Sequence, residues 1–173
     1  MKKILFTIVS LLVTVNMFAG SSIKVKEGDA SFMKNSGTVA VVINWDNAQW
    51  NKEMPVREHW TEEYDTYVSE GYAKFVEGFN EKSKSLKVAD SAEGATYVMN
   101  IEVTNVDRFW SAMSVVPGNK HKMWGTVTVT EKATGKVVCV YSLNEFKGGR
   151  DFSILDSFKE MMKNLGKELA EQK

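Results

Sequence analysis

The chain has 173 residues, with 22 basic side chains, 22 acidic side chains and a single cysteine. This length suits one domain rather than two. One cysteine cannot form an internal disulfide, so the fold must be stabilised by its hydrophobic core. The balanced charge excludes the basic surface that non-specific nucleic-acid binding requires, and we therefore predict no nucleic-acid partner.

The first twenty residues predict an export signal. A basic start at Lys2 and Lys3 precedes an apolar run over residues 4–15, and small residues around Ala19 and Gly20 suit cleavage. The run is shorter than the roughly 20 residues that span a bilayer. We therefore predict a cleaved signal peptide over residues 1–20, and no membrane span after cleavage. Removal of Lys2 and Lys3 leaves 20 basic against 22 acidic residues, a net charge of −2.

The destination that follows is the periplasm or the outside of the cell. No cysteine lies near the cleavage site, which excludes a lipoprotein anchor. Residues 21–36 are polar and predict a mobile lead-in to a single domain over residues 37–173. Residues 38–45 form a continuous run of strand formers, typical of a central strand.

A long helix is predicted from about residue 58 to residue 82. Its apolar residues recur every three or four positions and form one aromatic stripe. Gly71 and Gly78 interrupt this helix, and we expect them to mark a close approach to the sheet. The stripe has two interpretations, core packing on the sheet or an aromatic groove that carries a small ligand. It consists of Trp60, Tyr64, Tyr67, Val68, Tyr72, Phe75, Val76 and Phe79.

Three further strands are predicted over residues 97–104, 123–130 and 136–146, because apolar and polar residues alternate there. Gly135 suits the tight hairpin between the last two of these strands. On the last strand, the inward face holds Val137, Cys139, Tyr141 and Leu143. This places Cys139 as a buried structural thiol.

A short strand at residues 86–88 and a terminal helix complete the fold. Ser153 and Asp156 suit the start of that helix, after a break at Gly148 and Gly149. The order β-α-β-β-β-β-α predicts an α+β domain of two layers, in which both helices cover one face of a mixed sheet of about five strands. If strands 38–45 and 86–88 are parallel neighbours, the long helix is the crossover between them.

Catalytic and metal-binding motifs are absent from the sequence. It contains no HExxH, CxxC, GxSxG or phosphate-binding loop, so we predict no catalytic residues, no metal and no cofactor. Asp46 and His59 are the one candidate acid–base pair. They leave open a small hydrolase as an alternative function.

The stretch 109–118 joins two strands, yet it is rich in large apolar residues. One interpretation is that the strands extend further and the loop folds back over the end of the sheet. The other is a docking surface, since exposed loops seldom carry so many apolar side chains. The candidate partner-binding residues are Trp110, Met113, Val115 and Val116, with Trp45 and Trp50 beside them.

Four stretches carry a resemblance to known proteins: residues 26–33 (KEGDASFM), 75–80, 95–98 (ATYV) and 163–169 (KNLGKEL). Together they resemble a group of small exported proteins of Bacteroidetes-type bacteria that have no assigned function. More remotely, the element order is similar to the α+β domains of envelope assembly proteins, such as the curli-secretion lipoprotein and the TolB amino-terminal domain.

This resemblance implies an exported, non-enzymatic binding or assembly module of the bacterial cell envelope. Such a module acts through protein contacts, with a protein partner or with itself. The chain lacks the lipid-bearing cysteine and the pore-forming insert of the curli-secretion type, so a secretion channel is not implied. No functional residue carries over.

Overall fold

The computed structural model describes residues 22–111 and 118–172. The predicted signal peptide and Met113, Val115 and Val116 lie outside the described residues. In the described part of the chain, no helix is both long and apolar enough to cross a membrane. In chain order the elements are β1 (Ile23–Gly28), a 3-10 helix (Ala30–Lys34), β2 (Gly37–Asn44), β3 (Gln49–Trp50), β4 (Met54–Pro55), α1 (Val56–Trp60), a second 3-10 helix (Thr61–Glu63), α2 (Tyr64–Lys82), β5 (Leu86–Val88), β6 (Tyr97–Ser111), β7 (Gly118–Glu131), β8 (Val137–Asp151) and α3 (Ile154–Ala170).

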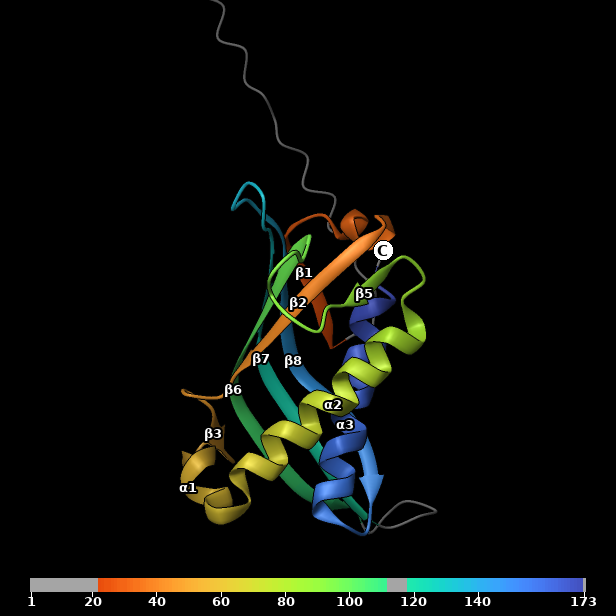
Figure 1. Cartoon of the computed structure of the whole chain (residues 1–173). Helices are drawn as coiled ribbons and strands as arrows, with labels where there is room; N and C mark the ends of the chain where they lie inside the picture. Colours follow the sequence, from red (N-terminus) through yellow and green to blue (C-terminus); the bar gives the residue numbers. More distant parts are fainter. Residues whose placement is uncertain (1–21, 112–117, 173) are drawn as a thin grey trace, which may run out of the picture.

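The predicted α+β class is confirmed, but over residues 22–111 and 118–172 the sheet has eight strands rather than five. Six of them lie in the order β1-β8-β7-β6-β2-β5, and the short β3 and β4 attach beside β6. Figure 1 shows α2 and α3 together on one face of this sheet, as predicted. Within the part of the chain that the structure describes, no helix covers the other face, which we call the open face.

The predicted lead-in is part of the sheet. Residues 23–28 form β1, which pairs antiparallel with β8 from Ile23↔Leu143 to Gly28↔Cys139. Ile23, Phe32 and Met33 are buried. Only the first residue of β1 is buried, and the other five are exposed. In the sequence of β1, apolar and polar residues alternate only from Ile23 to Lys26, a run too short to identify a strand.

The centre of the sheet is parallel. β2 pairs in parallel with β5, through Gly37↔Leu86, and with β6, through Val39↔Tyr97. Strands β2 and β5 are thus parallel neighbours, which is the condition on which the predicted crossover depends. The chain between them forms α1 and α2, because a parallel pair needs a long crossover.

Strands β6, β7 and β8 are longer than predicted, and the pairings between them contain register shifts. The predicted inward position of Val137 is wrong, since its side chain is 44% exposed. A shift between Val129 and Thr130 pairs Thr130 with Val137, so the alternation of β8 restarts at Cys139, which is fully buried. Gly135 adopts the predicted positive φ, at 69°.

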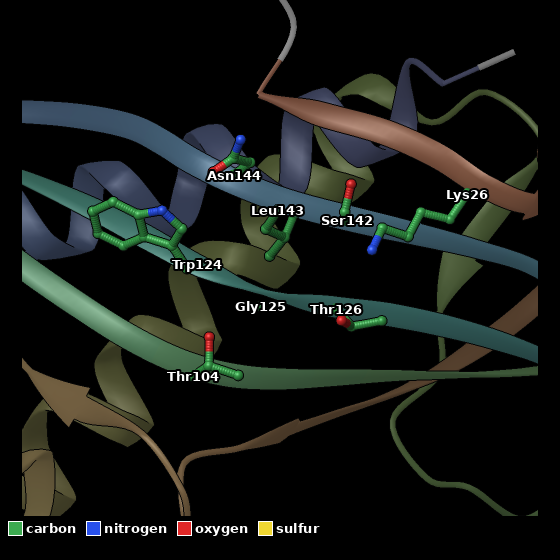
Figure 2. A pocket seen from close by; sticks show the side chains of 8 residues that line it. All are labelled: Lys26, Thr104, Trp124, Gly125, Thr126, Ser142, Leu143 and Asn144. Atoms are coloured by element: carbon green, nitrogen blue, oxygen red, sulfur yellow. The ribbon is translucent and has the colours of Figure 1, made fainter. Parts of the chain in front are cut away.

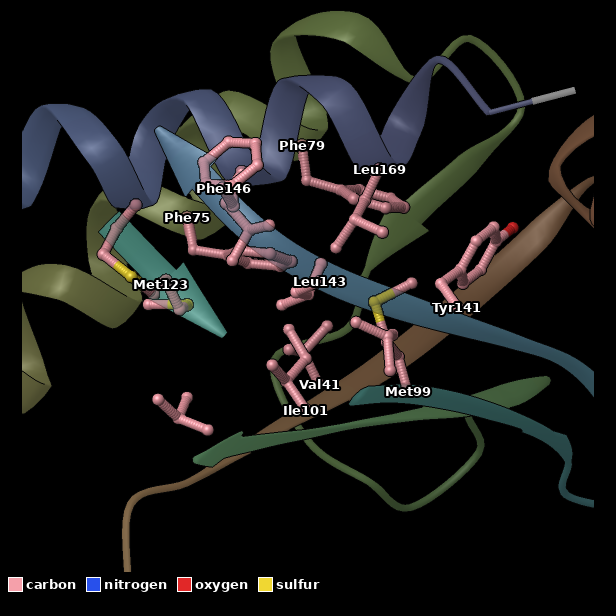
Figure 3. Packing of buried hydrophobic residues seen from close by; sticks show 14 of the residues in the cluster. Val41, Phe75, Phe79, Met99, Ile101, Met123, Tyr141, Leu143, Phe146 and Leu169 are labelled. Carbon is pink, nitrogen blue, oxygen red and sulfur yellow. The ribbon is translucent and has the colours of Figure 1, made fainter. Parts of the chain in front are cut away.

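The core lies between the sheet and the two helices. Figure 3 shows Phe75 and Phe79 of α2 and Leu169 of α3 packed over Met99 and Ile101 of the sheet. The predicted long helix begins differently. Helix α1 and a 3-10 turn precede α2, and Thr61 at the join has a positive φ of 41°.

The two helices are in backbone contact. A Cβ at Gly78 would lie 2.0 Å from the carbonyl oxygen of Lys163, and a Cβ at Gly166 would lie 2.2 Å from that of Phe75. A Cβ at Gly71 would meet the ring of Phe158. The glycines of the long helix therefore mark a close approach to α3, and the prediction that they face the sheet is wrong.

Candidate functional site

Trp45 and Trp50 do not form a docking surface. Each is only 5% exposed, because both rings pack against Trp60 of α1. The Trp45 ring lies 5.7 Å from Trp60 and 5.8 Å from Phe158, and Trp60 stacks on Tyr67 at 4.6 Å between ring centroids. This aromatic cluster forms one end of the core. The prediction that Trp45 and Trp50 bind a partner is wrong for that reason.

The candidate acid–base pair is not assembled. Asp46 and His59 are both exposed, and among the described residues no hydrogen bond or ion pair joins them. The backbone N–H of Asp46 donates to Asn44 Oδ1 at 2.8 Å. The His59 ring stacks on Trp50 at 4.2 Å, and its partial burial lowers its pKa. The hydrolase alternative therefore has no geometric support.

A second histidine, His121, occupies a position that we did not predict. Its side chain is fully buried, and its Nδ1 lies 2.8 Å from the hydroxyl oxygen of Ser157. The Ser157 hydroxyl donates to the carbonyl of Ile154 at 3.2 Å, so His121 Nδ1–H is the donor toward Ser157. The other ring nitrogen, Nε2, has no partner in the described structure.

A serine–histidine pair suggests nucleophilic catalysis, but this one cannot reach a substrate. His121 and Ser157 are both 0% exposed, and no group of three or more His, Cys, Asp or Glu side chains in the described residues could hold a metal ion. The Ser157 hydroxyl also donates its hydrogen bond to the carbonyl of Ile154. We assign the pair a structural role. Alternation continued back from Met123 would have placed His121 on the buried face, and this is the signal that sequence reasoning missed.

The aromatic groove between helix and sheet is also ruled out. Phe75 and Phe79 are 0% exposed, and Tyr64 and Tyr67 are buried as well. Their rings fill the interface between α2 and its neighbours. A surface hollow does exist, but it lies on the open face, on the opposite side of the sheet (Figure 2).

Trp110 is exposed, as the docking hypothesis requires. It lies near the end of β6 and is 52% exposed, and its ring lies 6.4 Å from that of Phe152, which is 69% exposed. These two side chains form what we call the Trp110–Phe152 pair. The strands themselves extend to Ser111 and resume at Gly118, so the predicted extension of the strands is correct too.

The backbone beneath this pair is held by side-chain hydrogen bonds. Trp110 pairs across the sheet with Asn119, which is only 2% exposed. Arg108 Nε donates to Asn119 Oδ1 at 2.8 Å, and Asn119 Nδ2 donates to the carbonyl of Phe152 at 2.6 Å. Asn119 therefore fixes the residues that carry both exposed rings.

Comparison with known proteins gives no family. No protein-family model matches the chain, and no curated protein matches it. Among solved structures, the chain is similar to the PelC dodecamer of Paraburkholderia phytofirmans, with 17% identity over 85% of this chain and 98% of that chain, at a TM-score of 0.41. A protein of Xanthomonas campestris matches with 16% identity over 78% of this chain and 80% of its own, at a TM-score of 0.40.

A hypothetical protein of Chlamydia trachomatis matches with 13% identity over 78% of this chain and 93% of its own, at a TM-score of 0.41. Because these TM-scores are low, we infer nothing about this chain's function from those structures. The resemblance to exported proteins of Bacteroidetes-type bacteria is not tested by them and stays a prediction.

Proposed function

We propose that this protein is an exported, non-enzymatic assembly module of the bacterial cell envelope, and that it acts through protein contacts at the Trp110–Phe152 pair. The observation that carries the proposal is the exposure of two large aromatic rings on chain segments that the Asn119 side chain joins by hydrogen bonds. Aromatic side chains, tryptophan above all, dominate the energy of protein interfaces.

The partner that fits this surface best is a second copy of the chain. Side chains of both signs lie beside the aromatic pair, because Arg108 is two residues before Trp110 on β6 and Asp151 pairs with Asn119, the residue opposite Trp110. A two-fold contact places the same patch on both sides, so the basic groups of one copy meet the acidic groups of the other. A surface of one sign would repel itself in that arrangement.

The test is the oligomeric state of the chain that begins at Ser21, measured by sedimentation velocity over a wide range of concentrations. We expect reversible self-association. Trp110→Ala should weaken it by more than about 1 kcal/mol, which is roughly a fivefold rise in the dissociation constant. Phe152→Ala should act in the same direction.

Val137→Ala is the matched control, because Val137 is an exposed apolar side chain in the hairpin at the other end of the same strands. It should leave the association unchanged. All three variants should keep the thermal midpoint of the parent, since each side chain is largely exposed. A chain that stays monomeric throughout, or that associates equally well as Trp110→Ala, would refute the proposal.

A further inference from the structure

The open face of the sheet contains a hollow of about 340 Å³ that the protein-contact function does not use. This volume lies within the range of small-ligand sites, roughly 300–1,000 Å³. Side chains from four strands line it, and Figure 2 shows Trp124 at one end and Lys26 at the other. The lining consists of Lys26, Thr104, Trp124, Gly125, Thr126, Ser142, Leu143 and Asn144.

Register shifts in three separate strand pairs converge on this hollow. The β1–β8 pairing shifts between Val25 and Glu27, so the displaced residue is Lys26. The β6–β7 pairing shifts between Val103 and Asn105, so the displaced residue is Thr104. Such bulges re-aim single side chains and are over-represented beside functional sites. Both displaced side chains line the hollow.

The third shift lies between β7 and β8. Met123 pairs with Phe146 and Gly125 pairs with Leu143, so Trp124 stands opposite two residues of β8 instead of one. One of those two residues is Asn144, and both Trp124 and Asn144 line the hollow. Independent irregularities in three ladders are thus concentrated at one place, and each one turns a lining side chain toward it.

The polar groups of the lining have free hydrogen-bonding capacity. In the described structure, the side chains of Lys26, Thr104, Thr126 and Asn144 make no hydrogen bond or ion pair with the protein. Threonine hydroxyls and an amide both donate and accept, which suits the hydroxyl groups of a ligand. The Trp124 ring adds a flat apolar surface with an N–H at its edge.

The charges of the hollow have one sign. No carboxylate lines it, Lys26 lies at one end, and the Lys52 ammonium lies 5.5 Å from the centroid of the Trp124 ring at the other. A ligand that spans the hollow therefore meets a cation at each end. We propose that the hollow binds an acidic saccharide, with hydroxyl groups on the threonines and Asn144 and carboxylates near Lys26 and Lys52.

An acidic peptide fits the site less well than a saccharide. Extended peptides gain affinity by pairing with a free strand edge. Beneath the hollow, β7 pairs with β6 on one side and with β8 on the other, and β8 pairs with β1, so their backbones are occupied. Recognition therefore depends on the side chains, which present hydroxyl, amide and ammonium groups around the Trp124 ring.

The experiment titrates the chain that begins at Ser21 with oligogalacturonate, and with malto-oligosaccharide as the neutral probe. Binding is followed by calorimetry and by the NMR signal of the Trp124 indole N–H. We expect saturable binding of the acidic probe, and on the order of tenfold weaker binding in Trp124→Ala and in Lys26→Gln. Thr104→Tyr, which fills the hollow and removes no ring or charge, should weaken binding equally.

Lys136→Gln and Val137→Ala are the matched controls, because both residues are exposed and lie away from the hollow. They should bind the acidic probe as the parent does. Equal binding of the neutral probe, of acetate or of a triglutamate peptide would overturn the proposal, as would the absence of any saturable response. Trp124→Ala should leave self-association unchanged, so the failure of one proposal is distinguishable from the failure of the other.

Discussion

The buried His121 should make the protein lose stability on mild acidification. Burial is the main cause that lowers the pKa of His121, from 6.5 to about 4, and the positive charge of Arg108 adds to it. In the unfolded chain the imidazole returns to its ordinary pKa. Between these two values the unfolded state binds a proton that the folded state does not, so folding becomes weaker as the pH falls.

The magnitude follows from the difference between the two pKa values. Each pKa unit corresponds to about 1.4 kcal/mol, so the displacement from 6.5 to about 4 represents about 3 kcal/mol in total. This stabilisation is fully present above pH 6.5 and is lost progressively as the pH approaches 4. It is a large share of the roughly 5–15 kcal/mol by which a domain of this kind is stable.

The assay is urea unfolding at a series of pH values across this window, for the parent and for His121→Asn. The asparagine amide can replace Nδ1–H as the donor to Ser157 Oγ, but it does not titrate. We expect the variant to be less stable than the parent at neutral pH and to show a flatter pH dependence. The ion-paired carboxylate of Glu77 titrates at lower pH, since Lys163 and Lys74 lower its pKa to about 2.

His59→Asn is the control for the other histidine, whose ring is exposed on top of Trp50. It should retain most of the pH dependence of the parent. If His121→Asn loses as much stability as the parent between pH 6.5 and about 4, then His121 is not the group that titrates. The burial argument would then be wrong.

Two substitutions test the packing of the helices. Phe158→Ala should lower the free energy of unfolding by about 3–5 kcal/mol, because the ring is fully buried against Trp45, Trp60 and Tyr67. An unchanged thermal midpoint would show that these contacts contribute little. Gly78→Ala should lower the free energy of unfolding by more than about 1 kcal/mol, because the added Cβ would overlap the Lys163 carbonyl. At an open helical site the same substitution would instead stabilise the helix, since alanine has the higher helix propensity. A stabilised Gly78→Ala variant would mean that the helices separate without cost.

The parts of the fold that sequence could predict are those with a repeating contact pattern. The meander strands bury alternate residues such as Met99, Ile101 and Val103, and this alternation is visible in the chain itself. The terminal helix is likewise visible, and Ser153 Oγ accepts from the Asp156 N–H at 3.2 Å as its cap. In these elements, local pattern and tertiary packing agree.

The parts that escaped prediction depend on contacts distant in sequence. Trp45 and Trp50 stand beside a polar loop, and nothing local reveals that both rings pack against Trp60 of α1. Lys26 and Thr104 are aimed at the hollow by single-residue register shifts, and such a shift depends on the partner strand. For the same reason the candidate sites rest on the structure, with Trp110 alone taken from the sequence.

The pairing of β1 with β8 also determines the order in which the chain can complete its fold. Ile23 pairs with Leu143, so β1 cannot join the sheet until β8, about 120 residues further along the chain, has formed. Contacts between residues so far apart in sequence form slowly, because the entropy of loop closure is lost before the pairing contributes any stabilisation. In a chain exported amino end first, β1 would be the first strand to emerge and among the last to pair. Until then the outer edge of β8 stays open, and a holding chaperone would have a strand edge to recognise.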